Sequence, residues 1–195
     1  MMDWQTWVSI FLGIGLAASA GFRVFVPLFA LSLAGYFGLL PLNAQWQWVA
    51  STPALIILAI ACIAESMAYL IPFVDHALDA LAVPLAGIAG TAVMASTMTD
   101  VSPAMTWALA IIGGGGSAAL IRGVAATGRV ASTATTGGLA NPVVSIAETG
   151  TAIGLSALAI FLPVIAAIAA LLAAVLIVWG IRAIRNRQRN RLLQP

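Results

Sequence analysis

The sequence predicts an all-α, polytopic helical membrane protein with about six or seven hydrophobic segments, some of them broken or re-entrant. Hydrophobic residues make up 62% of the 195 residues and charged residues only 7%, whereas a soluble domain carries roughly 25% charged residues. The stretch 164–178 is entirely apolar. Five arginines then follow: Arg182, Arg185, Arg187, Arg189 and Arg191. This pattern is typical of a membrane span that ends in the cytoplasm.

The amino-terminal apolar block, residues 4–40, is about twice as long as one span needs to be. It is interrupted at Gly21–Arg23 and again at Pro27. Glycine and proline weaken the backbone hydrogen bonding of a helix, so we expect two helices with a break near Arg23. A polar link over residues 41–48 follows, with two tryptophans suited to the membrane interface.

The middle of the chain divides at prolines and short polar turns. We expect a helix from Pro53 to Ile71, a short turn over residues 72–76 (PFVDH) and a span over residues 77–98. A further span is expected over residues 103–126. Its small residues 113–117 would let a neighbouring helix approach closely.

The segment 126–142 is too polar to face lipid. We therefore expect irregular backbone that is buried in protein or lines water, as in a re-entrant segment. Asn141 and Pro142 are expected to be the N-cap and first residue of the next helix, which carries Glu148. Such a helix start offers free N–H groups to an anion or a polar solute. The alternative is an ordinary solvent-exposed loop between two spans.

Two segments resemble each other within the chain. Residues 14–23 (IGLAASAGFR) and 112–122 (IGGGGSAALIR) share an order of glycine, serine and arginine. Each is followed by a proline-started helix with a glutamate, Glu65 or Glu148. Paired broken segments of this kind favour a pseudo-symmetric inverted repeat. The alternative is chance similarity in an apolar chain.

The expected domain organisation follows from these segments. Residues 1–186 form a single helical transmembrane domain, with halves 1–100 and 101–186 if the duplication holds. Residues 187–195 form a basic tail in the cytoplasm.

Ionisable residues within the apolar segments are few, and a charge at the bilayer centre costs roughly 2.5–3.5 kcal/mol. Such residues are usually paired or face a cavity. Glu65 is the strongest candidate for carrying a proton, because burial favours the neutral form of a carboxyl group. The alternative is that the pairs Arg23–Glu65 and Arg122–Glu148 only lock helices together. The candidates for lining a polar path are Arg23, Glu65, Arg122, Arg129, Asn141 and Glu148.

Asp75, His76 and Asp79 are secondary candidates. Asp75 and Asp79 lie four residues apart and so share one face of a helix, where their carboxylates could hold a hard cation. A simpler interpretation places all three at the membrane surface, near the start of a helix at Ala77, where acidic groups favour the helix dipole. No metal site and no cofactor are expected. The single cysteine, Cys62, excludes a thiolate metal site and a disulfide within the chain.

Four strings together resemble a family of small bacterial inner-membrane proteins that is catalogued only as a domain of unknown function. The resemblance covers most of the chain up to about Pro163 and implies a multi-spanning helical membrane protein. It assigns no catalytic or binding residue. The strings are GFRVFVPL (21–28), AESMAYLIPFVDHALD (64–79), PLAGIAGT (84–91) and TGGLANPVVSIAE (136–148).

Two local similarities point in the same direction. RVFVPLFALSLAG (residues 23–35) is similar to the arginine-containing stretch of the DedA family, whose members are implicated in moving lipid carriers across bilayers with re-entrant hairpins. GGLANPVVS (residues 137–145) is similar to the half-helix start of aquaporins. Both similarities imply half-helices that face a polar path.

These observations favour a small transporter, channel or lipid-translocating protein. In that interpretation Arg23, Arg122 and Arg129 meet an anionic group, while Glu65 and Glu148 balance charge or couple protons. One alternative is an intramembrane enzyme acting on a lipid phosphate. It would use residues 128–138 to cradle the phosphate, with Arg129 as an electrostatic clamp and His76 or Ser132 in the chemistry. Another alternative is a non-transporting assembly or helper protein.

The expected partners are the lipid bilayer, anionic headgroups at the arginine tail, and a small polar or anionic solute or a lipid. An oligomer is compatible with the sequence. Nucleic acid is not expected, because the cations form a juxtamembrane cluster rather than a soluble basic face. We expect a multi-pass protein of the bacterial inner (plasma) membrane, with its carboxyl end in the cytoplasm.

Overall fold

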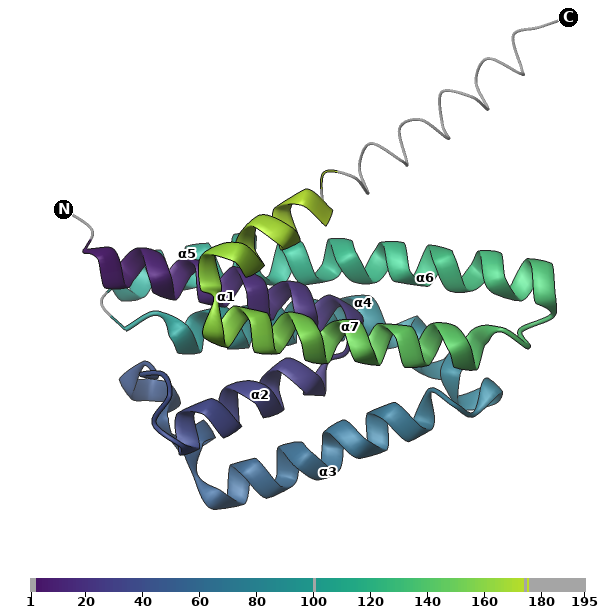
Figure 1. Cartoon of the computed structure of the whole chain (residues 1–195), viewed down its shortest axis with the longest axis horizontal. Coiled ribbons are helices and arrows are strands. Elements are labelled where there is room, and N and C mark those ends of the chain that lie inside the picture. The colour runs from purple at the N-terminus through teal and green to yellow at the C-terminus, as the bar shows by residue number, and fades with distance from the viewer. Residues whose placement is uncertain (1–2, 100, 174, 176–195) are drawn as a thin grey trace, which may run out of the picture.

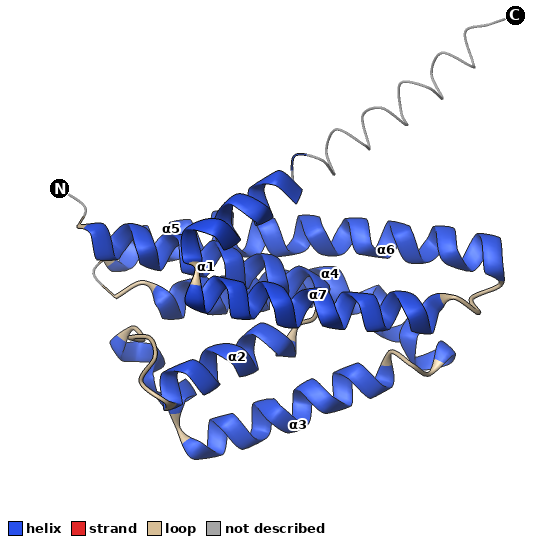
Figure 2. Cartoon of the chain, in the orientation of Figure 1, coloured by secondary structure: helices blue, strands red, loops and turns tan. Residues whose placement is uncertain are grey.

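The computed structural model describes residues 3–99, 101–173 and 175. Helices joined by short loops make up this part of the chain (Figures 1 and 2). Among the described residues, four helical segments are long and apolar enough to cross a membrane, and a bent helix pair forms a fifth candidate. Together with two shorter apolar helices they match the expected six or seven hydrophobic segments, so the all-α polytopic fold is confirmed. The four segments are Trp4–Phe22, Leu78–Thr97, Pro103–Thr136 and Asn141–Phe161.

The first apolar block folds as two helices, α1 (Trp4–Phe22) and α2 (Phe25–Tyr36). The predicted break near Arg23 is therefore confirmed, but the interruption expected at Pro27 is wrong. Pro27 is the third residue of α2, where a backbone N–H has no partner within the helix, so the proline ring removes no hydrogen bond. With 12 residues, α2 is about 18 Å long, much less than the roughly 30 Å of a hydrocarbon core.

The chain then turns through η1, a 3₁₀ helix (Ala44–Ala50), into α3 (Thr52–Ala68). The two helices meet at 67°. Ser51 is the N-cap of α3, and its side chain accepts a hydrogen bond from the Ala54 N–H at 3.4 Å. α3 packs mainly against α2 and η1 and runs along the lower edge of the molecule in Figure 1.

The next helix, α4 (Pro72–Thr97), begins earlier than expected. The turn predicted over residues 72–76 is wrong, because the chain turns over residues 69–71 and Pro72 opens the helix. Proline is well accommodated there, since its fixed φ suits the first turn and its missing N–H has no partner in any case. Asp75, His76 and Asp79 consequently lie inside α4, within its first turns, rather than ahead of a helix at Ala77.

Three consecutive elements form one long helical segment: α5 (Pro103–Leu109), the π-helical η2 (Ala110–Gly115) and α6 (Gly116–Thr136). The irregular backbone expected over residues 126–142 is wrong, because α6 continues to Thr136. Hydroxyl side chains bond back to carbonyls one turn earlier, which makes this polar stretch compatible with a helix. Thr127 donates to the Gly123 carbonyl at 2.9 Å and Thr136 to the Ser132 carbonyl at 2.8 Å.

A tight turn leads into α7 (Asn141–Phe161). Gly137 and Gly138 have φ values of 64° and 89°, which glycine adopts without a steric penalty. The N-cap position is Ala140, and Asn141 is the first residue of the helix. The prediction of Asn141 as the N-cap is therefore wrong by one position. After α7, a shorter apolar helix covers Pro163–Ala173.

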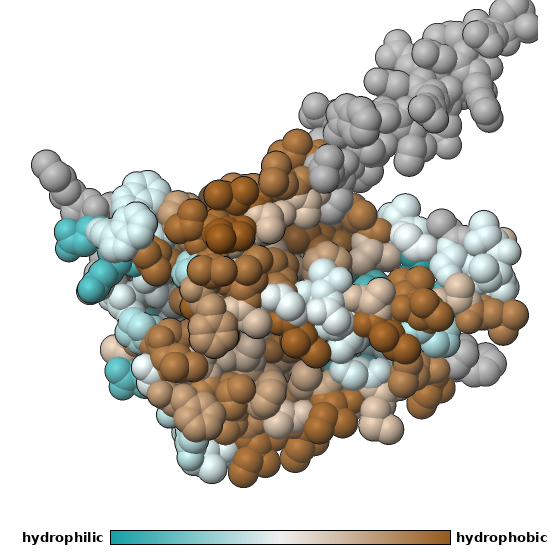
Figure 3. All heavy atoms as spheres, in the orientation of Figure 1, coloured by the Kyte–Doolittle hydropathy of each residue, from teal (hydrophilic) through white to brown (hydrophobic). Residues whose placement is uncertain are grey.

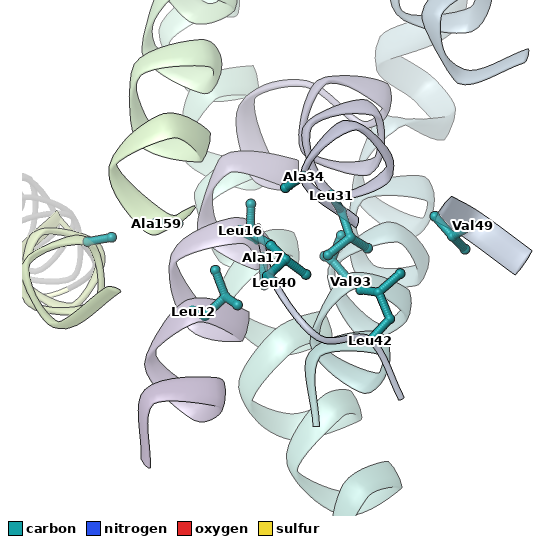
Figure 4. Close-up of a cluster of buried hydrophobic side chains, with 11 residues drawn as sticks. Leu12, Leu16, Ala17, Leu31, Ala34, Leu40, Leu42, Val49, Val93 and Ala159 are labelled. Atoms are coloured by element: carbon teal, nitrogen blue, oxygen red, sulfur yellow. The ribbon is translucent and has the colours of Figure 1, made fainter. Parts of the chain in front are cut away.

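Helix α1 packs against α4, α6 and α7. α4 approaches the α5–α6 segment closely, because a Cβ atom built on Gly90 would lie 2.6 Å from both the Ala118 Cβ and the Gly114 carbonyl oxygen. The close approach predicted for residues 113–117 is thus present. Figure 4 shows one cluster of the apolar core, with leucines of α1 and α2 near Val93. On the face shown in Figure 3, hydrophobic residues cover much of the surface, as lipid contact requires.

Candidate functional site

Three arginines from two helical segments meet at one tyrosine ring inside the bundle. Arg23, Arg122 and Arg129 are at most 2% exposed, and Tyr69 is 5% exposed. The distances from the guanidinium Cζ atoms to the centroid of the Tyr69 ring are 4.1 Å for Arg23, 4.5 Å for Arg129 and 5.2 Å for Arg122. We call these four residues the arginine cluster. A desolvated cation–π contact of this kind contributes about 2 kcal/mol.

The helices determine where the cluster lies. Arg23 directly follows α1, and Tyr69 directly follows α3. Arg122 and Arg129 are seven residues apart on α6, so they lie on the same face two turns from each other. Because α1 rises about 28 Å from Trp4 to its end, the cluster lies about one hydrocarbon thickness from the Trp4 end.

Glu148 on α7 is the carboxylate shared by the three arginines, and it is 6% exposed. Arg129 binds it with two donors: Nε to Oε1 at 3.1 Å, and Nη2 to Oε2. The Oε2 atom lies 3.8 Å from Nη2 of Arg23 and 3.9 Å from Nη1 of Arg122. The bidentate Arg129 pair fixes the orientation of this carboxylate.

Arg122 ties three helices together. Its Nη1 donates to the Phe22 carbonyl at the end of α1 at 3.1 Å, and its Nη2 donates to the Tyr69 hydroxyl at 2.7 Å. Nη2 also pairs with Oδ1 of Asp79 on α4. The helix start expected near Ala77 is wrong, so Asp79 lies beyond the first turn of α4 and not at a helix start. Asp79 thus pairs with a buried arginine, while its own side chain stays 23% exposed.

Arg23 is bonded mainly to neutral oxygens. Its Nε donates to Thr149 Oγ1 at 2.9 Å, and its Nη2 donates to the Ser145 carbonyl at 2.8 Å and to the Ser145 hydroxyl. Its Nη1 is buried and has no acceptor among the described residues. A buried N–H group without a partner carries a desolvation cost of about 1–3 kcal/mol, more for a charged group. Arg23 thus has one buried donor that no described acceptor uses.

Glu65 holds the break between α1 and α2. Its Oε1 accepts from the Val24 N–H at 2.8 Å, and its Oε2 accepts from the Phe25 N–H at 3.0 Å. These are N–H groups at the start of α2, which have no partner within that helix. The carboxylate therefore caps α2 from the neighbouring helix α3. The proton-carrying role expected of Glu65 stays a prediction.

The structure brings most of the predicted site residues together. Each of the three arginines lies within 4 Å of the Glu148 carboxylate, and Glu65 binds the backbone next to Arg23. Asn141 is 6% exposed and lies two turns before Glu148 on α7. It donates from Nδ2 to Thr133 Oγ1 at 3.1 Å.

The secondary candidates fare differently. Ser132 lies in α6, and its buried Oγ has no hydrogen-bond partner within the described part of the chain. The side chains of Asp75 and His76 lie outside the described residues, as do the five arginines of the tail. The backbone phosphate cradle expected over residues 128–138 is wrong. All but the last two of these residues are helical, and their N–H groups bond within α6.

Sequence reasoning missed Tyr69, Ser145 and Thr149. A usable signal was present on α7, where the buried residues recur at helical spacing and include polar side chains facing α1. Tyr69 lies four residues after Glu65, on the same face of the helix. The buried residues of α7 are Asn141, Ser145, Glu148, Ala152, Ser156 and Ala159.

The predicted duplication stays a prediction. Its two arginines do reach the same cluster, but Arg23 follows a helix break whereas Arg122 lies inside α6.

A groove adjoins the cluster between α3 and α7. It has a volume of about 330 Å³, and Ser145 and Thr149 line it together with Ser66, Met67 and Leu70. The two hydroxyl residues that hold Arg23 thus also face the groove. The guanidinium group of Arg23 lies behind these two residues and does not itself line the groove.

A protein-family model with the description "Domain of unknown function (DUF4126)" matches residues 10–183. No curated protein and no solved structure matches the chain. The family predicted from the four strings is confirmed by this match. The local similarities to DedA proteins and aquaporins stay predictions.

Proposed function

Since the chain belongs to the family of the domain of unknown function DUF4126, we propose its activity from its site: it binds an anionic group at the arginine cluster and moves it across the bilayer. The chain is an integral membrane protein with several apolar helices. The observation that carries the proposal is Arg23, a fully buried cation whose Nη1 lacks an acceptor among the described residues.

The stability of the folded protein does not by itself explain why the chain keeps such a cluster. Replacing a buried ion pair with well-packed apolar residues is often neutral or stabilises a protein by 1–4 kcal/mol. Charged groups within membrane helices are costly and mark ion and substrate pathways. Three guanidinium groups in a chain with only 7% charged residues therefore support a ligand-binding role.

Glu148 serves as the internal counter-ion in this mechanism. It pairs with Arg129 and lies within 4 Å of Arg23 and Arg122. An anion that enters beside Ser145 and Thr149 takes the free donor of Arg23, and Arg129 keeps Glu148 neutralised.

Proteoliposomes with the purified full-length chain test the proposal. Two probes are measured in parallel: release of entrapped radiolabelled phosphate, and translocation of acyl-labelled fluorescent phosphatidylglycerol followed by quenching from outside. We expect one of the two to move faster than in protein-free liposomes. Release of phosphate from a polyprenyl phosphate would instead support an enzyme. If neither movement nor release occurs, the proposal is wrong and a helper role is favoured.

Variants separate the site from general folding. Arg23→Gln should lower the initial rate about tenfold or more, because hydrogen bonds to charged groups contribute about 1.5–3 kcal/mol. Thr149→Ala removes the acceptor of the Arg23 Nε and should lower the rate several-fold. The matched control is Thr151→Ala on the same helix, since its hydroxyl is exposed and bonds only to the Ala147 carbonyl. Equal rates for the two threonine variants would contradict the role of Arg23.

A further inference from the structure

The arginine cluster is balanced in charge among the described side chains. Its three guanidinium groups stand against three carboxylates, those of Glu148, Asp79 and Glu65. Glu148 and Asp79 lie within 4 Å of the arginines, and Glu65 binds the two backbone N–H groups directly after Arg23. Net charge inside a membrane protein is costly, whereas paired charges are tolerated. An anion that joins this cluster therefore needs a positive charge to enter with it.

A proton on one of the three carboxylates supplies that charge, and the carboxylates differ in what protonation costs. Two donors of Arg129 bind Glu148, and Asp79 pairs with Arg122. A proton on either carboxylate breaks an ion pair and leaves a buried guanidinium group less compensated, which is strongly destabilising. Neither is a favourable place for the proton.

Glu65 makes no ion pair within 4 Å with any basic side chain that the structure describes. Its oxygens accept from neutral N–H groups, those of Val24 and Phe25. A protonated carboxyl group keeps a carbonyl oxygen as an acceptor, so protonation removes at most one of these hydrogen bonds and no ion pair. Of the three carboxylates, Glu65 therefore accepts a proton at the lowest cost.

The groups around Glu65 are few. Arg23 and Arg122 are the cations that act on it, and Cys62 and Tyr69 lie one turn before and after it. The elements packed against α3 are mainly α2 and η1. η1 contains no titratable side chain, and the only one in α2 belongs to its last residue, at the opposite end from Glu65.

The place of Glu65 in α3 gives it access to protons. Its side chain is partly exposed, in contrast to the buried arginines. α3 ends at Ala68, three residues later. The ends of membrane helices lie near the water interface, so a proton from water can reach this carboxylate.

We propose that Glu65 takes up one proton when the arginine cluster binds a singly charged anion, and releases it when the anion leaves. The proton comes from water and converts the carboxylate into a neutral carboxyl group. The anion adds one negative charge and the protonation removes one, so the net charge of the cluster does not change. This inference rests on the proposed function and makes it a cotransport of anion and proton.

Isotope-edited infrared difference spectroscopy tests the inference, because Glu65 and Glu148 are the only glutamates of the chain. The full-length protein is labelled with glutamate that carries ¹³C in its side-chain carboxyl group. It is reconstituted in ether-linked phosphatidylcholine, which has no ester carbonyl band. Spectra are recorded before and after adding inorganic phosphate or ether-linked phosphatidylglycerol. We expect a labelled band of a protonated carboxyl group with at least one of these anions.

Three variants assign the band. Glu65→Gln should lose it entirely, although Glu148 is still labelled. Glu65→Asp keeps a carboxyl group without the label, so an unlabelled band should replace the labelled one. The matched control is Asp3→Asn, which removes an exposed carboxylate before α1 and should leave the band unchanged.

The same variants show whether the proton is coupled to movement. In the proteoliposome assay, acidifying the side from which the probe enters should raise the initial rate of the unchanged chain. The increase should be several-fold larger than for Glu65→Gln. The ionisation of phosphate itself affects both proteins equally, so the difference between them reports Glu65.

A labelled band that persists in Glu65→Gln would assign the proton to Glu148 and overturn the inference. The absence of a labelled band with both anions would overturn it as well. If a probe crosses the bilayer but no band forms, the proposed function stands and the coupling fails. If the band forms but no probe crosses, the joint binding of anion and proton stands and the transport proposal fails.

Discussion

Tyr69 is the residue on which the three guanidinium groups converge. Like-charged groups this close repel one another, and the ring reduces that cost by offering its negative face to each cation. Its hydroxyl accepts from Arg122 at 2.7 Å. The aromatic ring and the hydroxyl therefore contribute separately, and substitutions can distinguish them.

We expect Tyr69→Leu to lower the free energy of unfolding by about 2–4 kcal/mol, because it removes the ring from three buried cations. Tyr69→Phe keeps the ring and loses only the hydroxyl, so it should cost about 1 kcal/mol. Unfolding in mixed micelles, followed by helix content, measures both. Tyr36→Phe is the control, since Tyr36 is 47% exposed. Equal losses for the Leu and Phe variants would show that the ring contributes nothing.

The pairing of elements depends on small residues at one helix crossing. Gly90 on α4 faces Gly114 and Ala118 on the long α5–α6 segment so closely that no side chain fits between the helices. Without a hydrophobic drive between helices in lipid, close packing of this kind holds the bundle together. The crossing also helps to place Arg122, one turn beyond Ala118, near Asp79 on α4.

At this crossing we expect Gly90→Ala to lower the free energy of unfolding by about 1–3 kcal/mol, because the added methyl group forces α4 and α6 apart. Gly123→Ala is the matched control, since a Cβ at Gly123 meets nothing within 4 Å. It should be neutral or stabilise by up to about 1 kcal/mol, from helix propensity alone. Similar effects of both substitutions on micelle unfolding curves would contradict the packing argument.

The whole molecule has an asymmetric distribution of cations. Five of its eight basic residues lie in the tail between Arg182 and Arg191, and the chain contains no lysine. Basic residues flanking a span are retained on the cytoplasmic side. The sequence therefore predicts the orientation of the chain.

We expect the carboxyl end to lie in the cytoplasm. A fluorescent protein that matures only in the cytoplasm, fused after Pro195, should fluoresce, whereas a phosphatase active only outside should stay inactive at the same position. Replacing the five tail arginines by glutamine should weaken this preference. A phosphatase that is active at Pro195 in the unchanged chain would overturn the orientation.

The sequence by itself determined the membrane environment, the helical class, the break at Arg23 and the rarity of interior charges. Composition and apolar run length are local properties, and the bilayer imposes them on every segment separately. Local polarity misled us over residues 126–136, because Ser and Thr hydroxyls can bond to their own helix and leave it intact. The helix interruption predicted at Pro27 was also wrong, because a proline in the first turn of a helix removes no hydrogen bond.

Only the tertiary structure decided which charges meet. Arg122 and Asp79 are 43 residues apart in the chain, and Arg23 and Thr149 are 126 apart. No local pattern links such residues, because their distance depends on how α4, α6 and α7 cross α1. The position of Tyr69 among three arginines results from the same crossings.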